Sequence, residues 1–143
     1  MEVSVKNVNV IINSIHNSEH SEDIMQVNAE GTYYNKNGKH YICYEETDNE
    51  SGEVSNNLLK IWENNVEMIK RGAGATRLHF EAGKLNNAYF QTIMGKLFVG
   101  VDTKHIKIIE ENDRLQVTIE YSLIIEEEKA SDCIVDILIK SDL

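Results

Sequence analysis

Apolar and polar residues alternate along most of this chain, which is the pattern of β-strands that bury one face. The most regular run places Leu115, Val117, Ile119, Tyr121 and Leu123 on a single side. Comparable runs recur along the chain, separated by short polar turns, and we count nine or ten of them. The pattern therefore favours strands throughout and predicts no helix.

The residues between these runs are typical of tight turns. Asn37-Gly38 is a strong hairpin signal, because both central residues of a type I′ turn need a positive φ. Further turns are expected at Asn64-Asn65, Gly83-Lys84 and Gly95-Lys96, and the chain contains no proline. Many strands joined by short turns predict an all-β fold, either an antiparallel up-and-down barrel or a sandwich.

The length of the runs favours the barrel. Strands of about ten residues suit a barrel of about eight strands, which encloses enough space for side chains or for one small ligand. We therefore predict a single domain over residues 1–143, an antiparallel up-and-down barrel of about eight long strands. The surplus runs would then be parts of long strands that bulges interrupt.

Composition supports one globular domain and argues against some partners. At 143 residues and 41% hydrophobic composition, the chain can bury a core without a disulfide or a metal. A formal charge of −10 argues against nucleic acid and against an anionic membrane as partners. The first residues do not resemble a signal peptide, and no apolar run approaches the ~18 residues that cross a bilayer. We expect an acidic, cytoplasmic protein.

Both cysteines, Cys43 and Cys133, lie within apolar runs that read as strands. Small thiols are common in protein cores, so we expect two reduced, buried side chains. Neither cysteine lies in a sequence motif that pairs it with an activating histidine, so nothing at this level indicates an activated nucleophile.

Charge is distributed unevenly along the chain. The segment Lys70–Lys107 contains seven Lys or Arg residues and two acidic residues, whereas the rest of the chain is strongly acidic. A basic segment in an acidic protein favours an anionic ligand or an acidic protein surface, including that of a second copy. A protein-interaction module, or a homodimer that weakens steeply with salt, is therefore one hypothesis.

Residues in the second half of the chain resemble a known family. The residues that carry the resemblance are, in chain order, Arg71, Tyr89, Thr92, Gly95, Thr103 and Tyr121. Their order and spacing are similar to those of the YwiB-like family, small uncharacterised bacterial β-barrels placed with the calycins. The resemblance spans nearly the whole chain and implies a lipocalin-like antiparallel barrel, bacterial and cytoplasmic. It brings no established activity, cofactor or catalytic residue.

Our first hypothesis is a barrel that binds a small anionic or amphipathic ligand in its lumen. Calycins commonly hold small apolar ligands, which supports this by fold analogy. Arg71 shares a face with Ile69 and, if it points inward, would bind an anionic head group; at the rim it would pair with a carboxylate instead. Tyr89 and Tyr121 fall in the apolar phase of their strands. The candidate lining residues are Arg71, Tyr89, Thr103 and Tyr121. The same alternation fits a filled barrel and a hollow one.

A second polar group lies on one predicted strand. Arg77, His79 and Glu81 stand on one face at alternate positions, so an acid-base site of a small hydrolase or isomerase is a weaker hypothesis. Because Leu78 and Phe80 form the better inward face, the alternative is a solvated outer stripe.

The sequence offers no motif for cofactor or metal chemistry. It has no Gly-x-Ser-x-Gly, CxxC or HExxH motif, and the segment GAGATR leads into a strand where a dinucleotide site needs a helix. His16 and His20 would share a face only within a helical turn, and we expect a loop there. We predict no cofactor, no metal and no catalytic residue.

Overall fold

The computed structural model describes residues 4–48, 50–72 and 75–141, and these form ten β-strands. The strands are β1 (Lys6–Asn17), β2 (Glu22–Lys36), β3 (Lys39–Thr47), β4 (Val54–Trp62), β5 (Asn65–Gly72), β6 (Thr76–Glu81), β7 (Leu85–Thr92), β8 (Gly95–Glu110), β9 (Arg114–Ile125) and β10 (Glu128–Ser141). Each strand is antiparallel to the next, and β1 also pairs with β10, which closes the barrel. The part of the chain that the structure describes has no helix long and apolar enough to cross a membrane.

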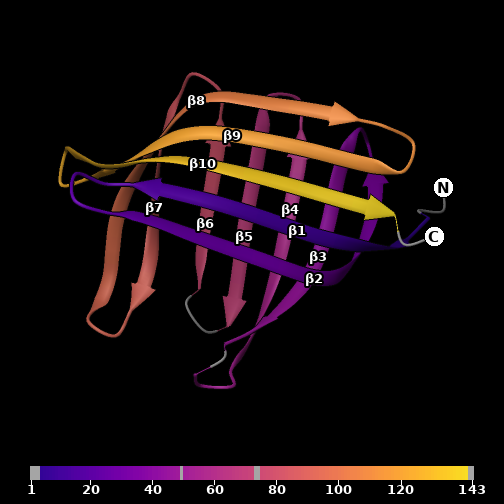
Figure 1. Ribbon diagram of the computed structural model, residues 1–143, viewed down its shortest axis with the longest axis horizontal. Helices are drawn as coiled ribbons and strands as arrows, with labels where there is room; N and C mark the ends of the chain where they lie inside the picture. Colours follow the sequence, from indigo (N-terminus) through magenta and orange to yellow (C-terminus); the bar gives the residue numbers. More distant parts are fainter. Residues whose placement is uncertain (1–3, 49, 73–74, 142–143) are drawn as a thin grey trace.

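The barrel is flattened into two layers that cross at a steep angle (Figure 1). Strands β2, β1, β10 and β9 run side by side across the front with most of β8, and β3 to β7 stand behind them. β8 belongs to both layers, because its first half pairs with β7 and its second half with β9. A register shift between Thr103 and His105 marks the bulge at which it changes partner.

The predicted all-β antiparallel barrel is confirmed, but the predicted number of about eight strands is wrong, since there are ten. Each two-residue turn ends one strand and starts another, even where the strand is as short as β6, with six residues. The turn residues predicted where strands end better than the lengths of the runs did. Asn37 and Gly38 have φ values of 54° and 77°, as a type I′ turn requires, and Asn64 has a φ of 57°. The bulges bend long strands and do not account for the surplus runs.

The core lies inside the barrel and consists of inward side chains from every strand. Because strand side chains alternate between the two faces, one set per strand points inward. The most deeply buried large side chains are Phe80, Ile42, Leu59, Ile61, Ile119 and Ile137. The regular run on β9 that was evident from the sequence contributes Leu115, Val117, Ile119 and Tyr121 to this core.

One seam in the barrel wall has few backbone hydrogen bonds. Among the described residues, β6 and β7 share a single bridge pair, Thr76 with Phe90, whereas β7 and β8 share eight pairs. Side chains bridge the seam instead: Thr76 Oγ1 donates to the carbonyl of Tyr89 at 3.0 Å, and Asn86 Nδ2 donates to the carbonyl of His79 at 3.3 Å. The barrel is therefore closed at this seam mainly by side chains.

Candidate ligand site in the barrel lumen

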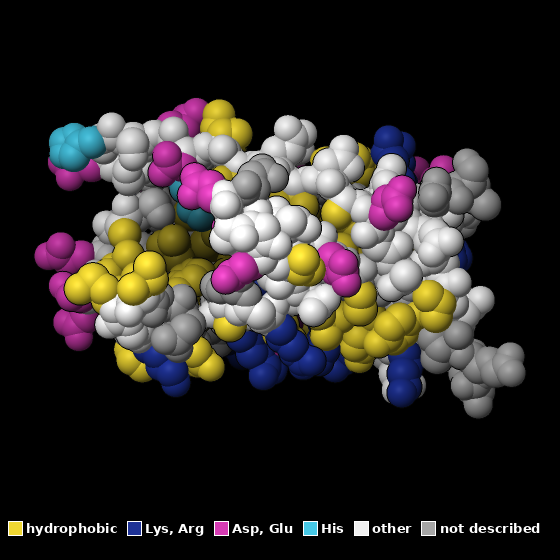
Figure 2. Space-filling model, turned by 90° about the horizontal axis from the view of Figure 1, so that it is seen from below, with side chains coloured by type: hydrophobic (Ala, Val, Ile, Leu, Met, Phe, Trp, Pro, Cys, Tyr) yellow, Lys and Arg dark blue, Asp and Glu magenta, His cyan; other side chains and the backbone are white. Residues whose placement is uncertain are grey.

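A cavity of about 260 Å³ occupies one half of the lumen. Its lining is largely apolar and comes from every strand except β8. The apolar side chains include Ile12, Val27, Tyr44, Leu59, Met68, Leu78, Phe80, Phe90, Leu123 and Val135. From below, the molecule is hollowed, with hydrophobic side chains inside the hollow (Figure 2). Ligand pockets in proteins are typically apolar concavities of roughly 300–1,000 Å³, so this cavity suits a small ligand.

A few polar side chains also line the cavity. Lys70 comes from β5, Glu46 from β3 and His16 from β1. Lys70 forms no ion pair with the residues that the structure describes. Its charge helps to lower the pKa of Asp48, but hydrogen bonds from the backbone N–H groups of Glu50 and Ser51 lower that pKa more. The cavity thus has an apolar body and an unpaired cation in its wall.

His16 contacts a cysteine that is distant in the sequence. Because β1 pairs with β10, His16 lies opposite Cys133, and Nδ1 of the imidazole is 3.3 Å from Sγ of the thiol. Oγ of Ser131 lies 3.4 Å from the same sulfur. The ring of His16 also meets the ring of Tyr121 edge-on, with 6.4 Å between the centroids.

Burial keeps both neighbouring groups of His16 in their neutral forms. Burial raises the pKa of the Cys133 thiol, although hydrogen bonds from Ser131 and Tyr121 act in the opposite direction. Burial also raises the pKa of Tyr121 well above its usual value, with the neighbouring Cys133 adding to the effect. Cys133 is therefore a protonated thiol near neutral pH and not an activated thiolate.

These polar groups form one row across four strands. Thr103 pairs with Tyr121, Tyr121 with Cys133, and Cys133 with His16. Thr103 is fully buried, and its Oγ1 has no hydrogen-bond partner among the described residues. Most buried hydroxyls in proteins have a partner, so this row is an unusual polar feature of an apolar lumen.

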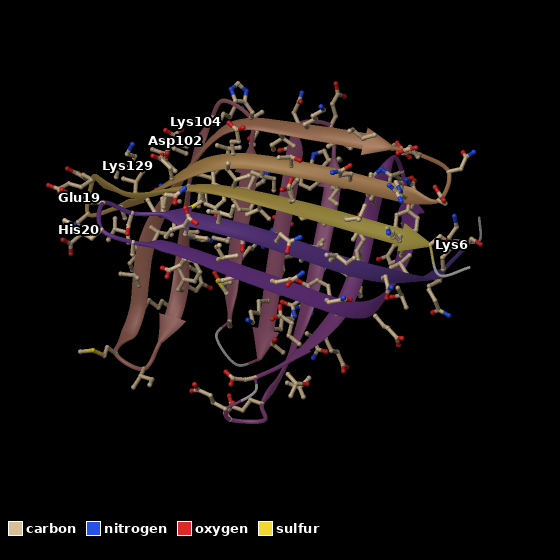
Figure 3. All side chains as sticks on the ribbon, viewed as in Figure 1. Lys6, Glu19, His20, Asp102, Lys104 and Lys129 are labelled. Carbon is tan, nitrogen blue, oxygen red and sulfur yellow. The ribbon has the colours of Figure 1, made fainter. Side chains whose placement is uncertain are left out.

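The opposite end of the barrel contains a second inward histidine, His40. The two ends are marked by Lys6, the first residue of β1, at one end and by Glu19 and His20, which follow β1, at the other (Figure 3). Nδ1 of His40 is 2.7 Å from the hydroxyl of Tyr33, and its Nε2 is 3.7 Å from a carboxylate oxygen of Glu110. Nδ2 of Asn35 lies 3.5 Å from the same Nδ1, and since an amide nitrogen only donates, Nδ1 is the acceptor of this group. Both nitrogens of His40 thus have polar neighbours.

The structure places two of the four predicted lining residues outside the lumen. Arg71 is exposed and pairs with the exposed Asn56, because Val66, Met68 and Lys70 form the inward face of β5. The predicted inward orientation of Arg71 is therefore wrong by one residue, and Lys70 takes that position. Tyr89 is exposed and lies beside Phe98 and under the ammonium of Lys96, 4.6 Å from the ring centroid.

The other two predicted residues lie inside the barrel. Tyr121 is buried and lines the cavity, where its ring packs against Phe80 with centroids 4.7 Å apart. Thr103 is buried beside Tyr121 but behind the cavity wall. The structure therefore brings Thr103 and Tyr121 together and separates both from Arg71 and Tyr89.

Arg77, His79 and Glu81 each have a separate structural partner. Arg77 donates from Nε and Nη2 to the same oxygen of the buried Glu67, at 3.1 and 2.8 Å. Nε2 of His79 is 2.9 Å from Oδ1 of Asn65. Glu81 pairs with Lys84 at 3.0 Å. The three side chains do not form an acid-base group, because their contacts lead to different neighbours.

The structure confirms the predicted burial of one cysteine but not of the other, and it places His16 and His20 in different surroundings. Cys133 is buried as expected, but Cys43 is exposed on the outer face of β3, so its prediction as a core thiol is wrong. His20 lies in the turn after β1, near Glu19, and His16 points to Cys133. The described residues contain no cluster of three or more metal-binding side chains.

The hairpin of β7 and β8 exposes a group of large apolar side chains. Ile93 and Met94 at its tip are fully exposed, and Leu85, Leu97 and Phe98 are also largely exposed. A contiguous apolar patch on a surface often marks an interaction site. The hairpin projects from the barrel at the left of Figure 1.

Comparison with known proteins agrees with this architecture. Residues 10–137 match the sequence profile of a family described as a domain of unknown function, DUF1934. The chain belongs to this family. The DUF1934 match covers β2 to β9 in full and most of β1 and β10, so it describes the barrel as a whole.

A similar protein from Bacillus subtilis matches in both sequence and structure. The uncharacterised β-barrel protein YwiB of strain 168 is 23% identical over 118 residues, which is 82% of this chain and 82% of that protein. The crystal structure of the ywiB protein superposes with a TM-score of 0.85 at 19% identity, covering 97% of this chain and 94% of that one. The resemblance to YwiB-like barrels is confirmed, and at this identity the structural likeness concerns the fold.

Proposed function

We propose that this protein binds a small amphipathic molecule with an acidic group in the barrel lumen. The observation that supports the proposal is the cavity of about 260 Å³, apolar over most of its wall. Burial of an alkyl chain there contributes about 0.8 kcal/mol for each methylene removed from water. Filling such a cavity also restores the packing contacts that its lining lacks.

The acidic group is inferred from Lys70. Its ammonium has no ion-pair partner among the described residues, and it comes from a strand whose other inward residues are apolar. The carboxylate of a ligand would form an ion pair with the ammonium of Lys70 at this point. The chain of the ligand would then lie against the apolar wall. Glu46 lies on the same wall, so a ligand with one acidic group is favoured over one with several.

Calorimetric titration with decanoate and 1-decanol tests this proposal. Both probes have the same chain, and only decanoate has a charge for Lys70. We expect wild type to bind decanoate more tightly than decanol, and Lys70→Gln to weaken decanoate binding by about fivefold while leaving decanol unchanged. Leu78→Trp, which fills the lumen, should weaken both probes at least about tenfold.

Arg71→Gln is the matched control, because Arg71 is the next residue of β5 and points outward. It removes the same charge from the opposite face of the strand, so it should bind both probes as wild type does. Absence of decanoate binding to wild type, or equal effects of the Lys70 and Arg71 substitutions, would contradict the proposal.

A second candidate function is self-association through the β7–β8 hairpin. The observation that favours it is the exposure of Ile93 and Met94, since turn tips normally carry polar residues. Native mass spectrometry at two salt concentrations measures the oligomeric state and also any bound small molecule. A dimer that persists at high salt would favour an apolar hairpin interface, whereas a monomer at every concentration would count against it.

A further inference from the structure

We propose that His16 is the second polar contact of the lumen and donates a hydrogen bond from Nε2 to an oxygen of the ligand. This inference rests on the proposed function, and it narrows the ligand class to amphipathic acids that carry a hydroxyl or keto oxygen along the chain. It follows from the hydrogen bonds of His16, its position in the cavity wall and the place of its strand in the ring.

The proposed tautomer of His16 follows from a donor direction at Cys133. The thiol is buried and protonated, so it can donate to Nδ1 at 3.3 Å. The hydroxyl of Ser131 can in turn donate to the sulfur at 3.4 Å. With this direction the thiol donates and the imidazole accepts, so the imidazole is the tautomer with its proton on Nε2. The reverse direction, in which Nδ1 donates to the sulfur, is the alternative that the NMR measurement below distinguishes.

The edge of the ring that carries Nε2 is available to the cavity. His16 lines the cavity, and its Nδ1 edge is turned toward Cys133. Nε2 has no hydrogen-bond partner among the residues that the structure describes, in contrast to Nε2 of His40, which faces Glu110. A donor in an apolar wall gains most from a ligand that supplies an acceptor, because few other partners are available there.

His16 and Lys70 come from opposite walls of the lumen. In the ring order, β1 is separated from β5 by four steps in one direction and six in the other. A ligand whose acidic group pairs with Lys70 would therefore reach His16 with an atom further along its chain. Such a ligand has a single charge and one neutral oxygen, with an apolar chain between them.

A set of decanoates tests the inference, each with one hydroxyl or keto oxygen at a different carbon. Comparing their affinities identifies the carbon at which an oxygen reaches His16. We expect at least one isomer to bind wild type about fivefold more tightly than decanoate. His16→Phe keeps a ring against Tyr121 and should abolish this gain, measured as the ratio of the affinities for the isomer and for decanoate within the same variant. His16→Gln restores a side-chain N–H and should recover part of the gain.

Cys133 acts as a positioning residue, and its variants separate that role from packing. Cys133→Ser keeps a donor for Nδ1 and should keep the gain for the oxygenated isomer, whereas Cys133→Ala should lose it, with equal decanoate binding in both. Nitrogen-15 NMR of the free protein should show the tautomer of His16 with its proton on Nε2.

The inference would be overturned if no isomer binds more tightly than decanoate, if the gain survives in His16→Phe, or if Nδ1 carries the proton. The proposed function fails on a different observation, the absence of decanoate binding to wild type. If neither decanoate nor any oxygenated isomer binds, both are wrong.

Discussion

The two ends of the barrel use a histidine in contrasting ways. His40 and His16 both point inward, and each has its Nδ1 against a donor on another strand, the hydroxyl of Tyr33 or the thiol of Cys133. At the His40 end a carboxylate oxygen of Glu110 lies 3.7 Å from the second nitrogen. At the His16 end the ring lines a cavity, and its second nitrogen has no hydrogen-bond partner among the described residues.

The packing of the two ends differs in the same way. Ile61 pairs with His40 and is completely buried, whereas Leu78 lies on the cavity wall and is partly exposed. The more closely filled end, where the space beside His40 and Tyr33 measures about 50 Å³, stabilises the fold, and the end with the cavity of about 260 Å³ and one available donor is suited to binding. The comparison teaches that inward alternation alone does not distinguish the two uses.

The largest expected effect is on stability at the filled end. Ile61→Ala should lower the free energy of unfolding by about 2–5 kcal/mol, because the site cannot collapse around the space left. Leu78→Ala should cost roughly half as much or less, since its side chain already borders empty volume. Urea denaturation of both variants measures the difference. Equal losses would mean that the cavity end is packed as tightly as the other.

The next effect concerns pH at the His40 end. Burial lowers the pKa of His40 from 6.5, and the nearby Glu110 opposes this only in part. The unfolded state therefore binds more protons below pH 6.5, and the stability that neutral His40 contributes is lost as the pH falls from that value toward the folded-state pKa.

Denaturation of wild type and His40→Gln at pH 7.5 and pH 5.5 measures this contribution. The difference in stability between the two pH values should be smaller in the variant, because glutamine does not titrate. An unchanged difference would show that His40 is protonated equally in the folded and unfolded states.

The smallest expected effect is at Thr103, in the row that contains His16. Thr103→Val removes a buried hydroxyl that has no partner among the described residues and should raise the free energy of unfolding by about 1 kcal/mol. Ser122→Ala is the control, because Oγ of Ser122 is also buried but donates to Asp132 at 2.7 Å, and its loss should destabilise. A loss of stability in Thr103→Val would indicate that the hydroxyl has a partner in solution.

The fold could be predicted from the sequence because its signals are local. The alternation on β9 and the hairpin turn at Asn37 depend on neighbouring residues only. The predicted number of strands was wrong because separate runs were treated as parts of the same strand to fit a barrel of about eight. The orientation of Arg71 was predicted wrongly because Met68 and Ile69 are both apolar. Either residue could face the core, and only the pairing of β5 with β4 shows which one does.

The candidate site was much harder to predict, because it is made by pairing. His16 and Cys133 are 117 residues apart, and only the closure of β1 on β10 brings them together. In hindsight, His16 follows Ile12 and Ser14 on the inward phase of β1, and Cys133 starts the inward phase of β10. That phase was a usable signal, although it did not indicate which strands are neighbours.

The seam between β6 and β7 has a consequence for motion. Local openings of a protein need less free energy where backbone hydrogen bonds are few, and here a single bridge pair joins the two strands in the described part of the chain. Thr76 and Phe90, the residues of that pair, both border the cavity. We expect the amides along β6 and β7 to exchange with deuterium ahead of those of β9 and β10. A molecule too long for the mouth of the barrel would then have a lateral route through the wall, on the timescale of that opening.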